Sequence, residues 1–132
     1  MIREFIYLGN RAKVHADAAD TRGRFAMMEF WSRPGTEPPL HSHDHEDELF
    51  YVVEGRMKLV LGGEEQILEA GESAIAPRGT PHTFHVISPA LRSFAVFAPA
   101  GFEEFFRALA GDPPPPYQRI AEVAGQFGAR LL

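Results

Sequence analysis

Hydrophobic and polar residues alternate in short runs along most of the chain, and each run ends at glycine, proline or charged residues. Alternation with a period of two is typical of β-strands that bury one face. It predicts strands over residues 25–32, 48–54, 57–61, 65–69, 73–76, 82–87 and 91–98. Gly55 and the pair Gly62-Gly63 lie where hairpin turns are expected, because glycine readily adopts the positive φ of tight turns. Short strands with no helix between them pair antiparallel, which favours a sandwich, a jelly roll or a small barrel.

The pattern changes near the C-terminus, where apolar residues recur at helical spacing. The first apolar face is formed by Phe102, Phe105, Phe106 and Leu109, and the second by Ile120, Val123, Ala124 and Phe127. Both indicate short amphipathic helices, and Gly128 is a plausible stop for the second. We interpret the four prolines at 113–116 as a spacer between these helices rather than as a ligand for an SH3-like partner. We therefore expect an all-β domain over 1–100 and a helical tail over 101–132 packed on it, since about thirty residues cannot bury a core of their own.

Composition narrows the class of protein. The chain has 132 residues with 45% hydrophobic and 23% charged, which is typical of one soluble globular domain. The absence of cysteine excludes disulfides, thiolate metal ligands and cysteine nucleophiles, and permits a reducing cytoplasm. A net charge of -5 disfavours a nucleic-acid partner. No segment approaches the about 18 apolar residues of a membrane span, and we expect a cytoplasmic protein without a membrane partner.

Histidines are concentrated in the sequence. There are six, and all except His15 lie in two short windows that contain His41, His43 and His45 and then His82 and His85. Because side chains alternate along a strand, His41 and His43 point the same way and can hold one ion.

Further groups can reach the same ion. The acidic residues 44–47 are expected to form a solvated turn, after which Glu48 opens the next strand and can reach back. His82 follows the turn-rich segment 77–81 and approaches from another part of the sheet. Three imidazoles and a carboxylate suit one divalent transition-metal ion, Fe, Mn, Ni, Co, Cu or Zn, rather than calcium or magnesium.

The other histidines are predicted to lie off this site. His85 faces away from His82 on an extended strand, His45 falls in the acidic turn, and His15 is isolated. Phe50 and Phe84 lie two residues after Glu48 and His82, so they should point into the same cavity as a substrate pocket. The alternative for the phenylalanines is ordinary core packing, and for the histidines a place in polar surface loops.

Two motifs resemble those of the cupin superfamily. The first reads G-x5-H-x-H-x4-E-x6-G, formed by Gly35, His41, His43, Glu48 and Gly55, and the second reads G-x5-P-x-G-x2-H, formed by Gly71, Pro77, Gly79 and His82. The resemblance covers residues 35–86 and implies a double-stranded β-helix, or jelly-roll barrel. It also implies that His41, His43, Glu48 and His82 are metal ligands. Val86 stands where the full second motif has asparagine, which weakens an assignment to the germin-like branch.

Shorter segments, including residues 38–41 and 99–102, are similar to small single-domain cupins related to quercetin dioxygenase. That similarity implies a dioxygenase-type oxidoreductase acting on a small hydroxylated or aromatic molecule, with Glu48 also taking a substrate proton. The alternatives are an isomerase or lyase that needs no O2, and a non-catalytic small-molecule binding module. We expect a homodimer, because similar cupins are often dimers and the phenylalanine face of 102–109 must be covered by the barrel or by another subunit.

Overall fold

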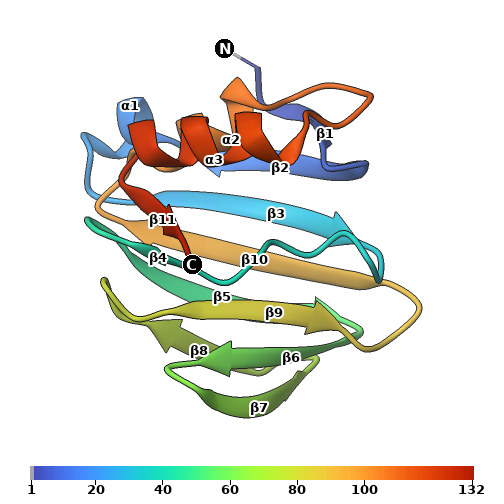
Figure 1. Ribbon diagram of the computed structural model, residues 1–132. Coiled ribbons are helices and arrows are strands. Elements are labelled where there is room, and N and C mark those ends of the chain that lie inside the picture. The colour runs from blue at the N-terminus through green and yellow to red at the C-terminus, as the bar shows by residue number, and fades with distance from the viewer. Residues whose placement is uncertain (1) are drawn as a thin grey trace.

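Two antiparallel sheets build the protein (Figure 1). The computed structural model describes residues 2–132. The six-stranded sheet has the order β1 (Glu4–Tyr7), β2 (Asn10–Ala16), β3 (Ala26–Ser32), β10 (Leu91–Ala98), β5 (Asp47–Glu54) and β8 (Ser73–Ala76). The five-stranded sheet has the order β11 (Ala129–Leu131), β4 (His41–His43), β9 (His82–Val86), β6 (Arg56–Leu61) and β7 (Glu64–Glu69). The predicted all-β, jelly-roll fold class is confirmed.

Three helices accompany the sheets: α1 (Ala18–Thr21), α2 (Glu103–Ala108) and α3 (Tyr117–Gln126). The last two correspond to the predicted tail helices and lie together on one side of the barrel (Figure 1). The tail also contains a strand, β11, which the sequence pattern does not predict. Among the described residues, no helix combines the length and the hydropathy that crossing a membrane requires.

One tight turn shows why the chain needs glycine there. Gly55 joins β5 to β6 with φ +89°, and a Cβ atom at this position would lie 2.2 Å from the carbonyl oxygen of Ala90. Any side chain would therefore push apart the turn and the segment that precedes β10. The predicted hairpin at this point is wrong, because β5 and β6 lie in different sheets and Gly55 joins one sheet to the other. The predicted hairpin at Gly62 and Gly63 is confirmed by the antiparallel pairing of β6 with β7.

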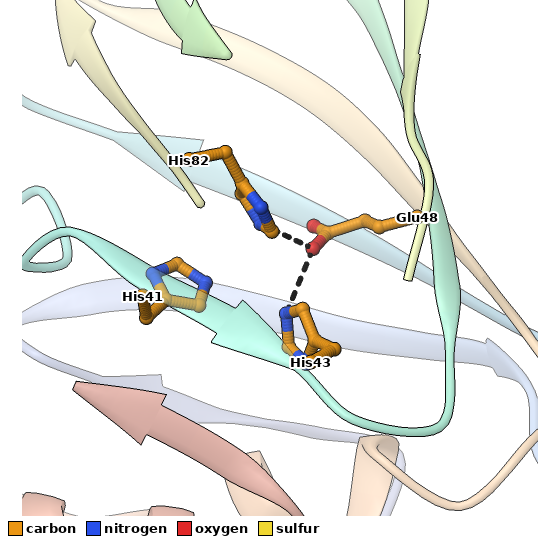
Figure 2. A group of neighbouring side chains, drawn as sticks. All are labelled: His41, His43, Glu48 and His82. Carbon is orange, nitrogen blue, oxygen red and sulfur yellow. Dashed lines mark hydrogen bonds and ion pairs between the residues drawn. The ribbon is translucent and has the colours of Figure 1, made fainter. Parts of the chain in front are cut away.

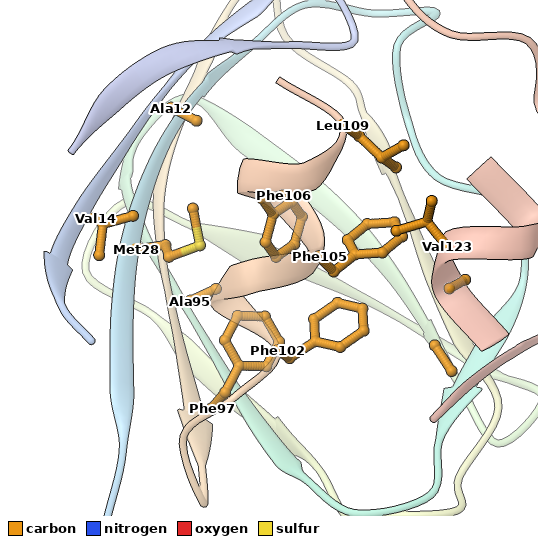
Figure 3. Packing of buried hydrophobic residues seen from close by; sticks show 12 residues of the cluster. Ala12, Val14, Met28, Ala95, Phe97, Phe102, Phe105, Phe106, Leu109 and Val123 are labelled. Carbon is orange, nitrogen blue, oxygen red and sulfur yellow. The ribbon is translucent and has the colours of Figure 1, made fainter. Parts of the chain in front are cut away.

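The core consists of two apolar clusters. One fills the space between the two sheets with residues such as Phe50 and Val52 of β5 and Met57 and Leu59 of β6. The other joins the inner face of the six-stranded sheet to the tail (Figure 3), and its members include Val14, Met28, Phe97, Phe102, Phe105, Phe106, Leu109 and Val123. The phenylalanine face of α2 is thus covered by the chain's own barrel, which removes one of the two reasons to expect a second subunit.

A charged cluster lies on the outer face of the six-stranded sheet. Glu29 of β3 is only 3% exposed. Its carboxylate lies 2.7 Å from His15 Nε2 and accepts a second hydrogen bond from Arg92. His15, to which the sequence gives no role, therefore makes a structural hydrogen bond to a buried carboxylate. Burial acts to raise the pKa of Glu29, but the hydrogen bonds from His15 and Arg92 outweigh it, and the pKa lies below its ordinary value of 4.5.

This depressed pKa predicts how stability depends on pH. The ionised form of Glu29 is favoured in the folded state, so its contribution is present above about pH 4.5 and is lost as the pH falls through the lower folded pKa. Glu29→Gln should reduce the free energy of unfolding by about 1–2 kcal/mol at pH 7 and by much less near pH 3. Urea unfolding at both pH values measures the difference, with Glu64→Gln as an exposed control. A deficit that is equal at pH 7 and pH 3 would contradict the ion-pair interpretation.

Candidate metal centre

Two of the predicted ligands lie on β4, a strand of three residues. His41 and His43 flank Ser42, and His41 is the direct pairing partner of His82 on β9. The alternation along β4 and this one pairing bring three imidazoles together, with ring centroids 4.4 Å apart for His41 and His82 and 5.3 Å for His43 and His82. Figure 2 shows the three rings pointing toward a common centre.

Glu48 approaches this centre from β5, in the opposite sheet. Its Oε1 atom lies 3.1 Å from His43 Nε2 and 3.2 Å from His82 Nε2. One ligand atom from each of the four residues lies within 4.8 Å of every other. The structure therefore brings together all four residues that the sequence predicts as a metal site.

Backbone carbonyls fix the position of the proton on two of the three rings. His41 Nδ1 lies 2.8 Å from the carbonyl oxygen of Pro39, and His82 Nδ1 lies 3.0 Å from that of Thr80. A carbonyl can only accept, so each Nδ1 carries a proton. His41 Nε2 therefore keeps its lone pair for an ion, whereas His82 Nε2 is hydrogen-bonded to Glu48 Oε1 at 3.2 Å, a contact that a bound ion would replace.

His43 gives a second indication of a missing cationic partner. Its Nε2 atom lies 3.1 Å from Glu48 Oε1, but neither of its buried ring nitrogens has a hydrogen-bond partner. Buried polar atoms are rarely left in this state, because each costs about 1–3 kcal/mol. An ion bound by His43 Nε2 satisfies that atom. The donor set of three nitrogens and one carboxylate oxygen fits a divalent transition metal.

The electrostatics favour the metal-binding protonation state for Glu48 and His41 but not for His82. Burial acts to raise the pKa of Glu48, but the His43 and His82 rings beside it lower the pKa to about 2. Burial, followed by the neighbouring His82, lowers the pKa of His41 to about 4. Burial also opposes protonation of His82, but Glu48 outweighs it and raises its pKa. At neutral pH Glu48 is a carboxylate and His41 is a neutral imidazole.

The structure keeps His45 and His85 out of the cluster. Both are exposed, and His85 lies on the face of β9 opposite His82, as the strand parity predicts. The prediction of a solvated acidic turn over 44–47 is wrong for one residue. Glu46 is only 5% exposed, and its Oε1 lies 3.7 Å from His43 Nδ1. A charged residue in an acidic run looks solvent-exposed in sequence, and only the fold places it behind the histidine.

A cavity of about 100 Å³ opens beside the four residues. Phe50 and Phe84 line it, as their spacing from Glu48 and His82 predicts, and the Phe50 ring lies 5.7 Å from the ring of His82. The tail supplies another wall that the sequence does not assign to the site. Phe102 in that wall packs edge-on against His43 at 4.4 Å between ring centroids. The cluster therefore faces a small, mostly apolar space.

The comparison with protein families decides the assignment. The family model described as a cupin domain matches residues 29–96, which contain all four clustered residues. The chain belongs to the cupin family. The histidine and glutamate pattern, the jelly-roll topology and the family match agree on this point.

Individual relatives of this cupin have several kinds of function. Quercetin 2,3-dioxygenase of Bacillus subtilis is 32% identical over 101 residues, which are 76% of this chain but only 30% of the enzyme. The polyketide cyclase RemF of Streptomyces resistomycificus has a TM-score of 0.58 and 35% identity, over 70% of this chain and 66% of the cyclase. KdgF from Halomonas has a TM-score of 0.67 at 23% identity, over 75% of this chain and 86% of that one, and shows the shared fold.

The C-terminal strand, outside the matched region, supports the metal-bearing strand of this cupin. Strand β11 pairs with β4 so that Ala129 lies opposite His43 and Leu131 opposite His41. Arg130 Nε donates to Asp44 Oδ1 at 2.9 Å just beyond the paired residues. The two histidines therefore sit on a strand hydrogen-bonded on both sides, by β9 and by β11.

Gly128 directly precedes β11, so replacing it tests whether β11 holds β4 in position. It has φ +77°, and an added Cβ would lie 2.6 Å from the ring of His45. Gly128→Ala should lower the free energy of unfolding by about 1–2 kcal/mol, because L-residues resist this conformation. It should also weaken zinc binding several-fold by displacing β4.

Gly125→Ala is the matched control for Gly128→Ala. Gly125 lies in α3, and an added Cβ meets no atom within 4 Å. This change should stabilise the protein by up to about 1 kcal/mol, because alanine favours helix, and should leave zinc affinity unchanged. Chemical denaturation and competition titration with a chelator measure the two quantities. Equal zinc affinity of the Gly128→Ala variant and the wild type would show that β11 does not position the ligands.

Proposed function

We propose that this cupin is a metal-dependent oxidoreductase of the dioxygenase type that acts on a small hydroxylated or aromatic molecule. The observation that carries the proposal is the convergence of three imidazoles and a carboxylate on the wall of an apolar cavity. The similarity to quercetin 2,3-dioxygenase supports the same reaction class.

His41, His43 and His82, through Nε2, and Glu48, through its carboxylate, would hold the ion. A divalent transition metal supplies a Lewis acid there, and iron or manganese also supplies a redox centre. Glu48 then has a second task in the reaction. Both histidine contacts are made to Oε1, so Oε2 is the oxygen that can accept a proton from a substrate hydroxyl. Phe50, Phe84 and Phe102 exclude water and offer ring surfaces to an aromatic substrate.

Oxygen consumption tests the proposal. Protein loaded with iron or manganese is expected to consume O2 with at least one member of a panel of catechols, flavonols and β-diketones. Zinc-loaded protein serves as the control that binds the same ligands without redox chemistry. The absence of O2 consumption across the panel with both redox metals would rule out the dioxygenase proposal.

A second candidate function is a cyclisation, isomerisation or elimination that needs no O2. The 35% identity to the polyketide cyclase RemF favours it, and the same four residues provide the Lewis-acid site. Turnover by zinc-loaded protein under strict anaerobiosis would support this function over the first. Ligand-induced increases in melting temperature without turnover under either condition would instead indicate a binding module.

We propose that the protein is a homodimer formed through the outer face of the six-stranded sheet. Met27, Val96, Leu49 and Ile75 are direct cross-strand partners and form an apolar row over four strands. In the next row Glu29 is paired with Arg92 and hydrogen-bonded to His15, so two copies of this face meet without an unpaired carboxylate at this position. Light scattering should give a dimer at micromolar concentration for the wild type and a monomer for Val96→Glu. Ile67→Glu on β7 is the exposed control, and a monomeric wild type would contradict the proposal.

A further inference from the structure

The inner face of the six-stranded sheet is layered along the strands. From one end to the other, the paired inward residues are Glu48 and Phe97, then Phe50 and Ala95, then Val52 and Ser93, and last Leu91 with Ser32. The first layer belongs to the metal cluster and the second is apolar. Of these four layers, the third and the fourth carry hydroxyl side chains, those of Ser93 and Ser32. The cavity touches both Ser93 and Ser32 as well as the metal cluster.

A third hydroxyl, that of Tyr7, joins the polar end. Tyr7 pairs with Asn10 of β2, and the next residue, Arg11, pairs with Trp31 beside Ser32. The Tyr7 ring is fixed edge-on against Phe106 at 4.9 Å and also lines the cavity. Three residues that carry hydroxyl groups, from β1, β3 and β10, therefore line the cavity away from the metal cluster.

These hydroxyls differ from the other polar groups of the cavity wall. Asn10 Nδ2 donates to Thr36 Oγ1 at 2.7 Å, and Asn10 Oδ1 accepts from Arg33, so Asn10 is occupied within the protein. Within residues 2–132, the hydroxyls of Tyr7, Ser32 and Ser93 make no hydrogen bond to another side chain. Ser32 and Ser93 are 9% and 6% exposed. Buried hydroxyls that face a cavity are available to a ligand.

The side chains at the hydroxyl-bearing end of the cavity are uncharged, and this limits the ligands that can bind there. Among the described residues that line the cavity, none is lysine or arginine. Burial raises the pKa of Tyr7, so its phenol is neutral at physiological pH. A carboxylate or phosphate placed here would lose its hydration without gaining a cationic partner. Neutral hydroxyl or carbonyl groups suit three uncharged hydroxyls.

The dimensions limit the size of the ligand. Ser93 and Phe97 are four residues apart on β10, so the layer of Ser93 lies about 13 Å along the strand from the layer of Glu48, and the layer of Ser32 lies about 7 Å further. A metal–oxygen bond of about 2 Å and a hydrogen bond of about 2.8 Å leave about 8 Å for the ligand between its two contacts. The cavity of about 100 Å³ is of the order that holds a single ring.

We propose that Ser93, with Tyr7 and Ser32 beyond it, forms a second, polar contact region that recognises the far end of the substrate. The substrate class is a neutral molecule of about one ring, with metal-binding oxygen at one end and a hydroxyl or carbonyl at the other. This inference rests on the proposed metal site and specifies its substrate. Holding both ends fixes the orientation of the reacting end at Glu48.

Two metal-binding probes that differ at the far end test the inference. Zinc-loaded protein is titrated calorimetrically with benzohydroxamic acid and with its 4-hydroxy derivative, both of which bind zinc through the hydroxamate. The wild type should prefer the 4-hydroxy probe by about 3- to 10-fold, the value of one hydrogen bond. The preference should fall toward unity in Ser93→Ala and in the combination of Tyr7→Phe with Ser32→Ala. The 4-carboxy derivative should bind more weakly than the 4-hydroxy probe.

Ser73→Ala is the matched control, because Ser73 lies on the outer face of the same sheet, next to Tyr51. Comparing the ratio of the two probes between variants cancels the effect of the 4-hydroxyl on the hydroxamate itself. An unchanged ratio in all the cavity variants would overturn the inference. Normal probe binding and the expected ratios in a protein that consumes no O2 would overturn the dioxygenase proposal and leave the second contact region in place.

Discussion

His82→Ala is expected to reduce bound metal from one equivalent to nearly none while the barrel stays folded. His82 connects the two sides of the cluster, since it pairs with His41 in the sheet and its Nε2 lies 3.2 Å from Glu48 Oε1. Its loss removes one nitrogen ligand and leaves three groups that no longer surround an ion. Loss of an outer partner of a ligand already costs about 10- to 100-fold in metal affinity, so loss of the ligand itself should cost about 100-fold or more.

His85→Ala is the matched control for this substitution. His85 lies three residues further along β9, exposed on the opposite face. Elemental analysis after dialysis and a competition titration with a chelator measure the metal content and affinity of both variants. Unchanged stoichiometry in the His82→Ala variant would show that the ligand set is wrong. Circular dichroism checks that both variants keep the β-sheet content of the wild type.

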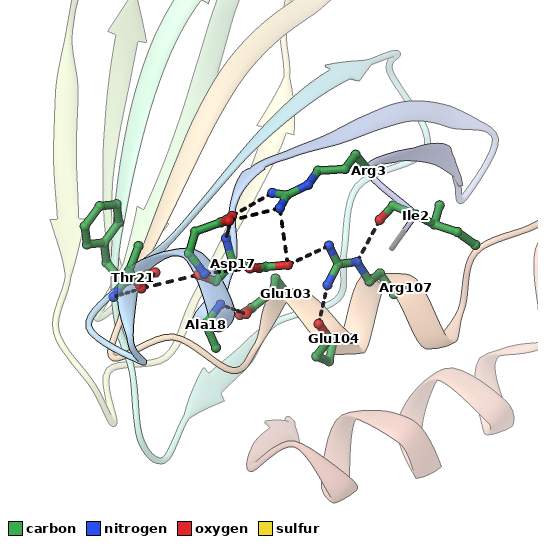
Figure 4. A network of polar contacts seen from close by, with 10 residues as sticks. Ile2, Arg3, Asp17, Ala18, Thr21, Glu103, Glu104 and Arg107 are labelled. Carbon is green, nitrogen blue, oxygen red and sulfur yellow. Dashed lines mark hydrogen bonds and ion pairs between the residues drawn. The ribbon is translucent and has the colours of Figure 1, made fainter.

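Arg107→Met is expected to cause the largest loss of stability among surface-accessible substitutions, about 3 kcal/mol. Arg107 on α2 donates to Asp17 Oδ2 at 3.1 Å, and it also pairs with Glu104 and bonds the carbonyl oxygen of Ile2 (Figure 4). Asp17 is only 1% exposed. Removing one partner of a buried ion pair leaves an uncompensated charge, which typically costs about 3–5 kcal/mol. Arg3, 3.8 Å from Asp17, offsets part of that cost.

A second change distinguishes the buried charge from lost packing. Asp17→Asn in the Arg107→Met background should restore part of the stability, because the residue left behind is then neutral. Arg119→Met on the exposed side of α3 is the control and should change stability by less than about 0.5 kcal/mol. Urea denaturation gives the four free energies of unfolding. A loss below about 1 kcal/mol for Arg107→Met would contradict the assigned role of this ion pair.

The site could be predicted because the pattern that marks its residues lies within single strands. Strand parity alone separates His41 and His43 from their neighbour Ser42, and His82 from His85, and the structure has the same separation. The position of Glu48 near the start of β5 follows from the apolar run that comes after it. These inferences depend only on the alternation of side chains, which holds in any regular strand.

The strands and the buried residue that the sequence did not predict depend on contacts with distant parts of the chain. β1 and β2 do alternate, with charged residues such as Arg11 and Lys13 on the outer face, but inward residues of β2 such as Asn10 and Ala12 are polar or small and give a weak hydrophobic signal. β11 has three residues and no detectable period, and it becomes a strand only because β4 offers hydrogen bonds to it. The burial of Glu46 likewise follows from the ring of His43 beside it. None of these features has a strong signature within its own segment.

The pairing of β11 with β4 also sets an order of folding events. Asp44 and Arg130 meet across 86 positions of sequence, so this contact closes one of the longest loops in the fold and carries a large entropic cost. The cupin core can form before that closure, with β4 still at the edge of its sheet and its histidines open to solvent. A metal ion that binds before this closure would afterwards lie beside a strand that β11 holds in place. We therefore expect the rate of metal loss to follow the rate at which β11 detaches from β4.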